Sequence, residues 1–288
     1  MAEPILKWVG GKRQLLQELH SRFPISYEKY HEPFIGGGAV FFDLEPSEGT
    51  INDLNRRLIS FYEVIRDHPE QLIEENHRHE YEEEYYYDAR DRFNELHKLD
   101  ERSLEEQIEE ASLMLYLNRT GYNGLYRENQ SGGFNVPFGR HTNPDFIRER
   151  QVRKASDILD DIEIYNRDFD YLVDCVDEGD LVYFDPPYEP VSQTADFTQY
   201  QSDGFDKDDQ RRLRDLAVKL SQNGVYVVLS NSPPVGELYE AVSEFTIEVV
   251  DAARMVNSDA DNRDDVAEVI ITNVPADRQR QQNLGNYS

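Results

Sequence analysis

The stretch Leu181-Val182-Tyr183-Phe184-Asp185-Pro186-Pro187-Tyr188 decides which fold we expect of this chain. Its first half is a short run of apolar and aromatic residues, which predicts a buried β-strand that ends where the prolines begin. The second half then places a carboxylate, a rigid piece of backbone and an aromatic ring at the carboxyl end of that strand. This combination is suited to hold a planar ring that carries an exocyclic amine.

Each residue type after the strand supports that interpretation. The amine of a nucleobase is a poor nucleophile because its lone pair is delocalised into the ring, and acceptors for its N–H groups favour a more nucleophilic geometry. Asp185 offers a side-chain acceptor, and Pro186 has no N–H, so the segment presents carbonyl oxygens. Tyr188 can stack on the ring, which is worth about 1–3 kcal/mol per base. The simpler alternative is a Pro-Pro turn with a packed tyrosine.

The formal charge of −28 argues at first against a nucleic-acid partner, because phosphate contacts require lysine and arginine. The basic residues are 23 arginines and 7 lysines, against 58 acidic residues. Scarce lysine in an acidic chain indicates a halophilic protein, since a Debye length of about 3 Å at 1 M salt makes self-repulsion tolerable. The alternative is an acidic protein whose partners are not anionic.

Cysteine content and hydropathy indicate the cellular compartment in which the protein is expected. The single cysteine, Cys175, excludes an intramolecular disulfide and a zinc site built on cysteines. The sequence begins without a charged-then-apolar leader, and no run approaches the roughly 18 apolar residues of a membrane span. We therefore expect a cytoplasmic protein that does not enter a membrane. His77 and His79 lack the companions of a metal site, so we expect no metal and a solvated helix face instead.

The amino-terminal segment has the pattern of a nucleotide-binding α/β half. A strand near residues 29–32 would lead into Gly36-Gly37-Gly38, and a second strand would end near Asp53. Glycines let the backbone approach a ligand, and an acid after the next strand can bind ribose hydroxyls, although a simple tight turn is the alternative. Position 41 is Phe where the dinucleotide fingerprint has glycine, which favours an adenosine-type ligand without a pyrophosphate. Apolar spacing predicts helices that contain Leu15, Leu16 and Leu19, then Val40, Phe41 and Leu44, and then Leu54, Leu58, Phe61 and Ile65.

The amino-acid composition and the predicted secondary structure change between about residues 69 and 167. We interpret this stretch as an inserted, mainly helical domain. Residues 70–110 are crowded with Glu, Tyr and His, and a helix is predicted through Leu104, Ile108, Ala111 and Leu115. Residues 118–127 and 132–140 then form a Gly- and Asn-rich pair of loops with aromatic residues. Arginine and asparagine suit bidentate contacts with base edges, and aromatic residues can wedge between bases. The alternative is a structural hairpin with surface arginines at Arg119, Arg127 and Arg140.

The α/β pattern returns after residue 164, where Asp168 would lie near the strand ends. A helix is predicted through Leu213, Leu216, Ala217 and Leu220, and a buried strand over residues 225–231. Residues 246–251 and 266–273 are predicted to form a closing antiparallel pair. From about Ala276 the chain is polar, and we expect a frayed tail.

Taken together, these residues carry a family resemblance. In order, the motifs are Leu6-Lys7-Trp8-Val9-Gly10-Gly11-Lys12, Glu32-Pro33-Phe34-Ile35-Gly36-Gly37-Gly38, Asn52-Asp53, residues 118–127 and 134–140, Asp185-Pro186-Pro187-Tyr188 and Thr194-Ala195-Asp196-Phe197-Thr198. The chain resembles the Dam family of DNA adenine methyltransferases over roughly residues 4 to 273. Residues 70–110 and the tail carry no motif that matches.

The resemblance implies a Rossmann-like, seven-stranded class I methyltransferase sheet, with S-adenosylmethionine as donor and adenine N6 of double-stranded DNA as acceptor. It implies a catalytic domain of residues 1–68 and 165–275, an inserted, mainly helical DNA-recognition domain of residues 69–164, and a polar tail of residues 276–288. GATC becomes the leading candidate for the recognition sequence. A partner restriction endonuclease also follows as a candidate.

The resemblance also implies roles for individual residues of this chain. Asp185, Pro186 and Tyr188 would hold the target base. The cofactor would be bound by Trp8, Lys12, Phe34, Gly36, Gly38, Asp53, Asp168, Phe169 and Asp185. DNA would be contacted by Arg119, Tyr122, Asn123, Leu125, Arg127, Pro137 and Arg140. Residues 254–265 are acidic where the family often has basic residues, so site preference could differ.

The expected mechanism is base flipping followed by direct in-line methyl transfer, without a covalent intermediate. Two alternatives remain open. One is an amino-methyltransferase that acts on cytosine N4, RNA or a protein amide, since a Pro-Pro-Tyr segment can hold any planar amine. The other is a catalytically inactive relative that binds DNA.

Overall fold

The computed structural model describes residues 2–8, 10–129, 131–188, 205–252 and 266–280, and it divides the chain into two compact units. The first unit comprises Met1–Gly11 and Ile35–Arg167, and the second comprises Lys12–Phe34 and Asp168–Ser288. Seven strands follow the order β3-β2-β1-β4-β5-β7-β6, so the predicted seven-stranded α/β fold is confirmed. The predicted division into a catalytic and an inserted recognition domain is a division by function and stays a prediction.

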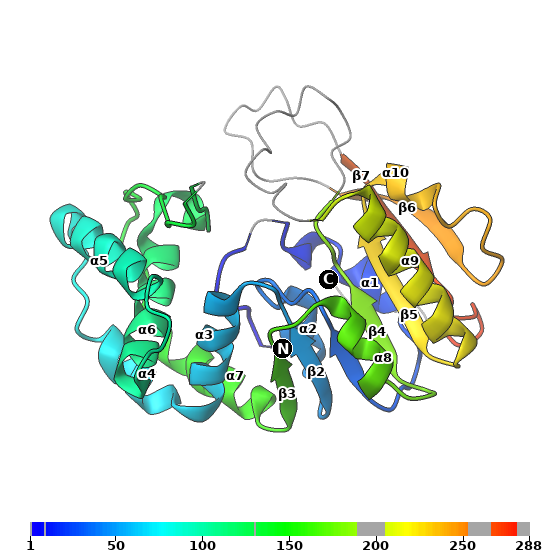
Figure 1. The fold of residues 1–288 in the computed structure, drawn as a ribbon, viewed down its shortest axis with the longest axis horizontal. Helices are drawn as coiled ribbons and strands as arrows, with labels where there is room; N and C mark the ends of the chain where they lie inside the picture. The colour runs from blue at the N-terminus through cyan, green and yellow to red at the C-terminus, as the bar shows by residue number, and fades with distance from the viewer. Residues whose placement is uncertain (1, 9, 130, 189–204, 253–265, 281–288) are drawn as a thin grey trace, which may run out of the picture. The chain divides into compact units, whose positions relative to one another are not determined.

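Five strands belong to the second unit (Figure 1). Parallel pairing joins β1 (Tyr30–Glu32) to β4 (Leu181–Phe184), and β4 to β5 (Tyr226–Asn231). Antiparallel pairing then joins β5 to β7 (Val266–Thr272), and β7 to β6 (Thr246–Ala252). All four residues of β4 are buried, because a central parallel strand has both faces covered. The predicted closing antiparallel pair is confirmed.

The second unit also contains the helix that carries the predicted apolar stripe 213–220. This helix, α9 (Lys207–Gln222), buries all four predicted residues, and its first turn is closed by a capping box between Asp206 and Asp209. The other helices of the unit are η1 (Lys12–Gln14), α1 (Leu16–Arg22), η3 (Phe169–Tyr171), α8 (Leu172–Cys175) and α10 (Pro233–Gly236).

The first unit pairs β2 (Gly49–Asn52) with β3 (Ile162–Tyr165) in parallel and is otherwise mainly helical. Helix α6 (Leu104–Thr120) packs against three neighbours and buries a nearly continuous run of residues, which makes it the centre of this unit. Ser103 and Glu106 form its capping box. The neighbours are α3 (Arg56–Asp67), α4 (Pro69–Asn76) and α5 (Glu83–Leu96), and the unit also contains α2 (Ala39–Leu44), η2 (Tyr122–Gly124) and α7 (Glu149–Leu159) (Figure 1).

His77 and His79 do not lie on a solvated helix face as expected, because α4 ends at Asn76 and His79 is half-buried and bonded to Tyr85 and Ser112.

Two further sequence expectations are wrong in detail. Leu54 was assigned to the apolar face of a helix, but it precedes the N-cap of α3, Asn55, and 66% of its surface is exposed. Asn55 accepts hydrogen bonds from the first backbone N–H groups of α3, so the helix begins after Leu54.

The second error concerns the tail, which was expected to be frayed from residue 276. Within residues 276–280 the backbone is paired: Ile25 N–H donates to the Arg278 carbonyl at 2.8 Å, and Arg280 N–H donates to the Phe23 carbonyl at 3.0 Å. The backbone that follows α1 offers unpaired groups, and this short polar segment satisfies them. Residues 281–288 lie outside the described part of the chain.

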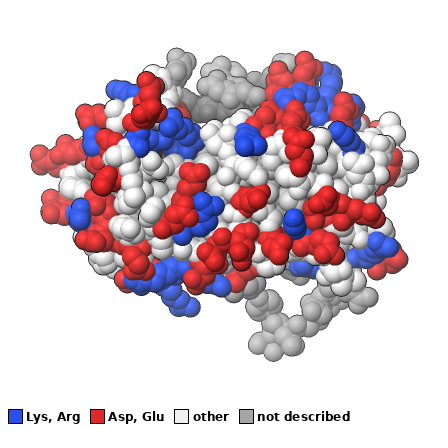
Figure 2. All heavy atoms as spheres, turned by 60° about the horizontal axis from the view of Figure 1, so that its bottom comes forward, with Lys and Arg blue, Asp and Glu red and all other residues white. Residues whose placement is uncertain are grey.

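Acidic side chains are spread over the face in Figure 2, with lysine and arginine interspersed among them. Many of these charges form exposed pairs, such as Arg153 with Glu70 at 2.7 Å. Single exposed pairs contribute about 0–1 kcal/mol, so they moderate the repulsion of a −28 chain only in part. No helix in the described part of the chain is long and apolar enough to cross a membrane.

Candidate functional site

Asp185 lies at the carboxyl end of β4, in the second unit. The parallel register pairs Phe184 with Leu229, so the next residues of the two strands, Asp185 and Ser230, become neighbours. Ser230 Oγ donates to Asp185 Oδ1 at 3.3 Å, and Lys12 Nζ lies 2.8 Å from the same oxygen. Lys12 is 5% exposed, so this ion pair is largely shielded from water.

The electrostatics at Asp185 reflect two opposed effects. Burial raises the pKa of Asp185, and the Lys12 ammonium acts against that rise. A lysine with its charge directed at the carboxylate favours the ionised form, which is an acceptor of hydrogen bonds only. The strand end therefore presents a hydrogen-bond acceptor beside a buried cation.

Tyr188 is fixed by contacts at both ends of its side chain. Its hydroxyl donates to Glu268 Oε2 at 2.6 Å, and Lys12 Nζ lies 4.5 Å from the centre of its ring. Burial raises the pKa of Tyr188 well above its usual value, so the phenol stays protonated and keeps donating to Glu268. Helix α9 holds the same segment, because Gln210 Nε2 donates to the Pro187 carbonyl at 3.1 Å.

Three partners of this segment were not among the predicted site residues, namely Ser230, Glu268 and Gln210. Two of them left a signal, because Ser230 ends the apolar run of β5 and Glu268 interrupts the apolar run of β7. A buried polar residue in an otherwise apolar strand calls for a partner. Identifying that partner needs the register between strands, which the sequence does not contain.

The second unit also contains three of the residues assigned to the donor, namely Phe34, Asp168 and Phe169. The rings of Phe34 and Phe169 lie 5.7 Å apart, and Phe205 packs on both, at 5.6 and 5.9 Å. Asp168 caps η3 by accepting from Asp170 N–H at 3.1 Å, and the same oxygen accepts from Arg212 at 2.9 Å. Phe34, Phe169 and Asp168 are thus brought together as the motifs suggested.

The glycine run lies in the first unit and depends on its lack of side chains. Gly36 and Gly38 have φ values of +46° and +68°, which favour glycine. A Cβ on Gly37 would stand 2.7 Å from Trp8 Cβ, closer than such atoms approach. Asp53 holds the loop through both of its carboxylate oxygens. Its Oδ2 accepts from Gly36 N–H at 3.1 Å, and its Oδ1 accepts from Asn55 N–H at 2.9 Å.

These features fit an adenosine-containing donor. Burial raises the pKa of Asp53, and the backbone N–H groups that donate to it act in the opposite direction and favour its charge. Each carboxylate oxygen has a second lone pair, so Asp53 can accept from the hydroxyls of a ribose while it holds the loop.

The loops assigned to DNA also lie in the first unit. Helix α6 extends to Thr120, so Arg119 is helical, and its Nε donates to the Asp145 carbonyl at 3.2 Å. The following residues, 121–129 and 131–140, are called the arginine loop below. In this loop the described β-pairing consists of the isolated bridges Gly121 to Phe138 and Glu128 to Phe134.

Several predicted DNA contacts are exposed on the arginine loop. Tyr122 is 52% exposed, and its N–H donates to the Pro137 carbonyl at 2.9 Å. Asn123, with a φ of +55°, and Arg140 are exposed as well. Arg127 instead donates to Asn135, through Nε at 2.7 Å, while Leu125 is half-buried. The loop therefore exposes a tyrosine, an asparagine and an arginine on one backbone.

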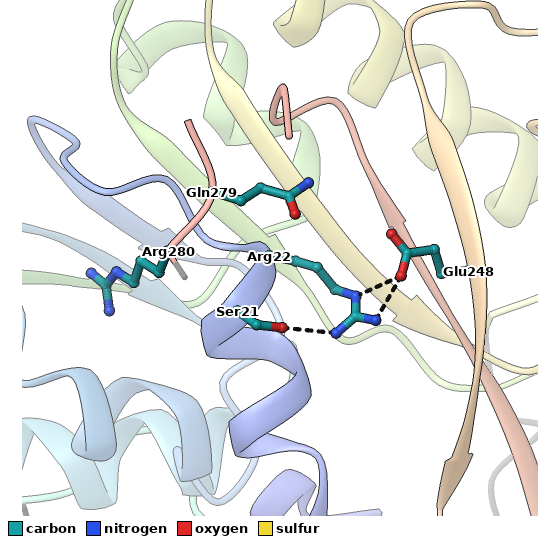
Figure 3. A pocket seen from close by; sticks show the side chains of 5 residues that line it. All are labelled: Ser21, Arg22, Glu248, Gln279 and Arg280. Carbon is teal, nitrogen blue, oxygen red and sulfur yellow. Dashed lines mark hydrogen bonds and ion pairs between the residues drawn. The ribbon is translucent and has the colours of Figure 1, made fainter. Parts of the chain in front are cut away.

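A separate pocket in the second unit shares none of these residues. It is lined by Ser21, Arg22, Glu248, Gln279 and Arg280 (Figure 3). Arg22 donates to Glu248 at 2.6 Å and to Ser21 at 2.9 Å, so its charge is matched within the pocket. Among the described residues, no cluster of His, Cys, Asp and Glu is arranged to hold a metal ion.

Comparison with known proteins yields matches along almost the whole chain. Residues 8–256 match the model of the family described as D12 class N6 adenine-specific DNA methyltransferase. The Type II methyltransferase M1.LlaDCHI of Lactococcus lactis subsp. cremoris is 43% identical, over 94% of this chain and 95% of its own length. The Type II methyltransferase M.MjaIII of Methanocaldococcus jannaschii is 38% identical, over 94% and 99%. A DNA adenine methylase of Vibrio cholerae is 33% identical, over 94% and 95%.

Proposed function

Because the chain belongs to the D12 class of N6 adenine-specific DNA methyltransferases, we propose that it methylates a flipped adenine in duplex DNA, with GATC as the leading candidate site. The observation that carries the proposal is the 185–188 segment, whose carboxylate and ring are both held from buried positions. The family implies S-adenosylmethionine as the methyl donor. When bound, the donor supplies an electrophilic methyl group on a sulfonium centre.

The role of the 185–188 segment follows from the chemistry of the adenine amine. Asp185 and the Pro186 carbonyl would accept hydrogen bonds from the two N–H groups and direct the nitrogen lone pair at the methyl group. Transfer would form the N6–methyl bond while the methyl–sulfur bond of the sulfonium breaks and leaves a neutral thioether. The Asp185 carboxylate would stabilise the positive charge on N6 until the extra proton is lost to water. Tyr188 would stack on the base and offset part of the few kcal/mol that flipping costs.

Lys12 and Glu268 would act by holding the 185–188 segment in the geometry that the reaction requires. Lys12 holds the Asp185 side chain at 2.8 Å, and Glu268 anchors the far end of the Tyr188 ring. Both contacts would limit the reorganisation that the segment needs during the reaction. The rate increase would come from positioning and electrostatics.

Donor binding would use the residues that the family motifs assign to it. Asp53 would accept from the ribose, and the glycine loop with Trp8 would provide a flat surface. Asp168 uses Oδ1 for its cap and for Arg212, so Oδ2 would accept from the adenine amine of the donor. The full proposed set is Trp8, Lys12, Phe34, Gly36, Gly38, Asp53, Asp168, Phe169 and Asp185.

DNA would be bound by the arginine loop and the end of α6. The exposed Tyr122 is placed to wedge between bases, and Asn123 and Arg140 can reach base edges or phosphates. Arg127 would exchange its contact with Asn135 for one with DNA. The full proposed set is Arg119, Tyr122, Asn123, Leu125, Arg127, Pro137 and Arg140. The Type II names of two relatives support a further candidate partner, a restriction endonuclease with the same recognition sequence.

The test is a transfer assay in molar potassium chloride with labelled S-adenosylmethionine. Matched duplexes with and without a GATC site are digested to nucleosides, and the methylated base is identified by mass spectrometry. We expect N6-methyladenine in the GATC duplex alone. N6-methyladenine in both duplexes would overturn GATC, N4-methylcytosine would overturn the target base, and donor binding without transfer would indicate an inactive relative.

Asp185→Ala should reduce the transfer rate at least about 100-fold, because it removes an acceptor aimed at developing charge. Asp174→Ala is the matched control, since Asp174 is an exposed acid on α8 of the same unit. We expect the control to keep the wild-type rate. Equal rates for the two variants would show that Asp185 does not act on the amine.

A further inference from the structure

In the first unit, Tyr126 adjoins both residues assigned to the donor and residues assigned to DNA. Its neighbours in the sequence are Leu125 and Arg127, both predicted to contact DNA. Its ring stacks on Trp8, with centroids 4.9 Å apart and planes 22° from parallel. Trp8 in turn lies against the glycine loop, because a Cβ on Gly36 would stand 3.0 Å from its ring. One aromatic pair therefore connects the glycine loop with the arginine loop.

The backbone beside Trp8 is fastened to the same loop. Lys7 N–H donates to Asn118 Oδ1 at 2.8 Å, and Asn118 Nδ2 donates to the carbonyls of Lys7 at 2.8 Å and Gly124 at 3.2 Å. A Cβ on Gly124 would collide with the Lys7 side chain, so the two segments are in close contact. Asn118 is 1% exposed, so these bonds are protected from water. A shift of Trp8 would thus be transmitted to the arginine loop.

Tyr126 also has contacts besides its stack on Trp8. Its hydroxyl donates to Glu128, and its ring lies 5.7 Å from Phe134. Glu128 and Phe134 form one of the two bridges of the arginine loop. The position of the Tyr126 ring is therefore tied to the pairing that shapes this loop.

We propose that Tyr126 is a positioning residue that couples binding of S-adenosylmethionine to recognition of DNA, through its stack on Trp8. A donor that packs on Trp8 would restrict the Trp8 ring, and the stack would restrict Tyr126 and the backbone of residues 125–127. The arginine loop would then lose less conformational freedom when DNA binds, which gives positive cooperativity. This proposal rests on the proposed function, since it takes the donor and DNA assignments as given.

The test measures coupling, which a merely structural residue would not change selectively. The affinity of the protein for a GATC duplex is measured by fluorescence anisotropy, with and without saturating S-adenosylhomocysteine, a donor product that permits no turnover. We expect wild-type protein to bind the duplex at least about fivefold tighter with the nucleoside present. By linkage, the duplex must tighten nucleoside binding by the same factor, which provides an internal check.

Variants at position 126 separate the ring from its hydroxyl. Tyr126→Leu keeps most of the volume but removes the stack, and we expect its coupling factor to fall to within about twofold of one. Tyr126→Phe keeps the stack and loses the bond to Glu128, and it should keep the wild-type factor. Tyr87→Leu is the matched control, because Tyr87 is a half-buried tyrosine on α5 of the same unit. A Trp8→Leu, Tyr126→Leu double variant should lose no more coupling than either single variant.

The outcomes distinguish this proposal from the function on which it rests. If wild-type protein methylates adenine but shows no coupling, or if Tyr126→Leu keeps the wild-type factor, the coupling role of Tyr126 is wrong and the function stands. Loss of coupling in Tyr126→Phe would likewise overturn the role of the stack. If wild-type protein binds neither the nucleoside nor DNA, the proposed function itself fails.

Discussion

A carboxylate buried in an apolar strand holds the ring of Tyr188. Glu268 is 7% exposed on β7, and its Oε2 is the acceptor for the Tyr188 hydroxyl. Hydrogen bonds to a charged group contribute about 1.5–3 kcal/mol, roughly twice the value of a neutral pair. In the proposed reaction, Glu268 would therefore act through the position of another side chain.

Replacing Glu268 should lower kcat/KM, although Glu268 itself does not touch the substrate. We expect Glu268→Leu to reduce kcat/KM about 10- to 150-fold, the kinetic equivalent of losing that hydrogen bond. Glu268→Gln keeps an oxygen acceptor and should recover most of the activity. Steady-state kinetics on a GATC duplex provide the measurement, and an unchanged kcat/KM in Glu268→Leu would remove Glu268 from the site.

At the scale of elements, helix α9 supports two parts of the site from its first turns. Gln210 donates to the Pro187 carbonyl, and Arg212 donates to Asp168 at 2.9 Å. Both side chains depend on a helix that begins at the Asp206 cap, where Asp208 and Asp209 N–H groups donate to the Asp206 side chain. Loss of this cap should therefore loosen the site as well as the helix.

Asp206→Ala is expected to destabilise the protein by about 1 kcal/mol and to lower Tm by a few degrees. It should also lower kcat/KM, because Gln210 and Arg212 lose their fixed positions. Ser103→Ala is the matched control, since it removes the cap of α6 in the other unit. Differential scanning fluorimetry and kinetics should show similar losses of Tm but a loss of kcat/KM in Asp206→Ala alone. Equal kinetics in both variants would contradict a role of α9 in the site.

Several elements were predictable, because β4 and β5 coincide with apolar runs and α9 with an apolar stripe, whereas β1, with His31 and Glu32, carries no such signal. β4 and the 185–188 segment could be identified from eight consecutive residues. The partners of that segment could not be identified, because Ser230 and Glu268 reach it through the pairings of β4 with β5 and of β5 with β7. The start of α3 was misplaced for a local reason, since the Asn55 cap prevailed over the apolar spacing that included Leu54.

At the scale of the whole molecule, charge sets the conditions under which the fold is stable. A net charge of −28 on 288 residues repels itself in dilute salt, and the described exposed ion pairs offset only part of that repulsion. Raising ionic strength from about 0.1 M to 1 M shortens the Debye length from about 10 Å to about 3 Å.

We expect Tm to rise as potassium chloride increases from about 0.1 M to 2 M, with most of the rise below about 1 M, where screening changes fastest. A thermal unfolding series at constant pH provides the measurement. Sodium chloride at matched ionic strength is the control, because screening does not depend on the identity of the monovalent ion. A Tm that is constant or falls with salt would contradict the halophilic interpretation of the composition.

DNA specificity was the least predictable property at this scale. The arginine loop and the end of α6 were proposed as DNA contacts because of their arginines in an acidic chain, yet Arg119 and Arg127 both donate to partners within the protein. In the proposed function, the bound duplex would decide which of these bonds is exchanged for a base. The loop sequence therefore suggests a DNA-contacting surface without identifying a recognition sequence.

The chain contains one tryptophan, and its indole lies between the glycine loop and the ring of Tyr126. All tryptophan emission from this protein thus originates at one known place, with no background from other indoles. Ligands that pack on the glycine loop would alter its quantum yield, and movement of the arginine loop would alter its emission through the stacked ring. Stopped-flow fluorescence on unlabelled protein could therefore time the arrival of each ligand in turn, without a reporter dye.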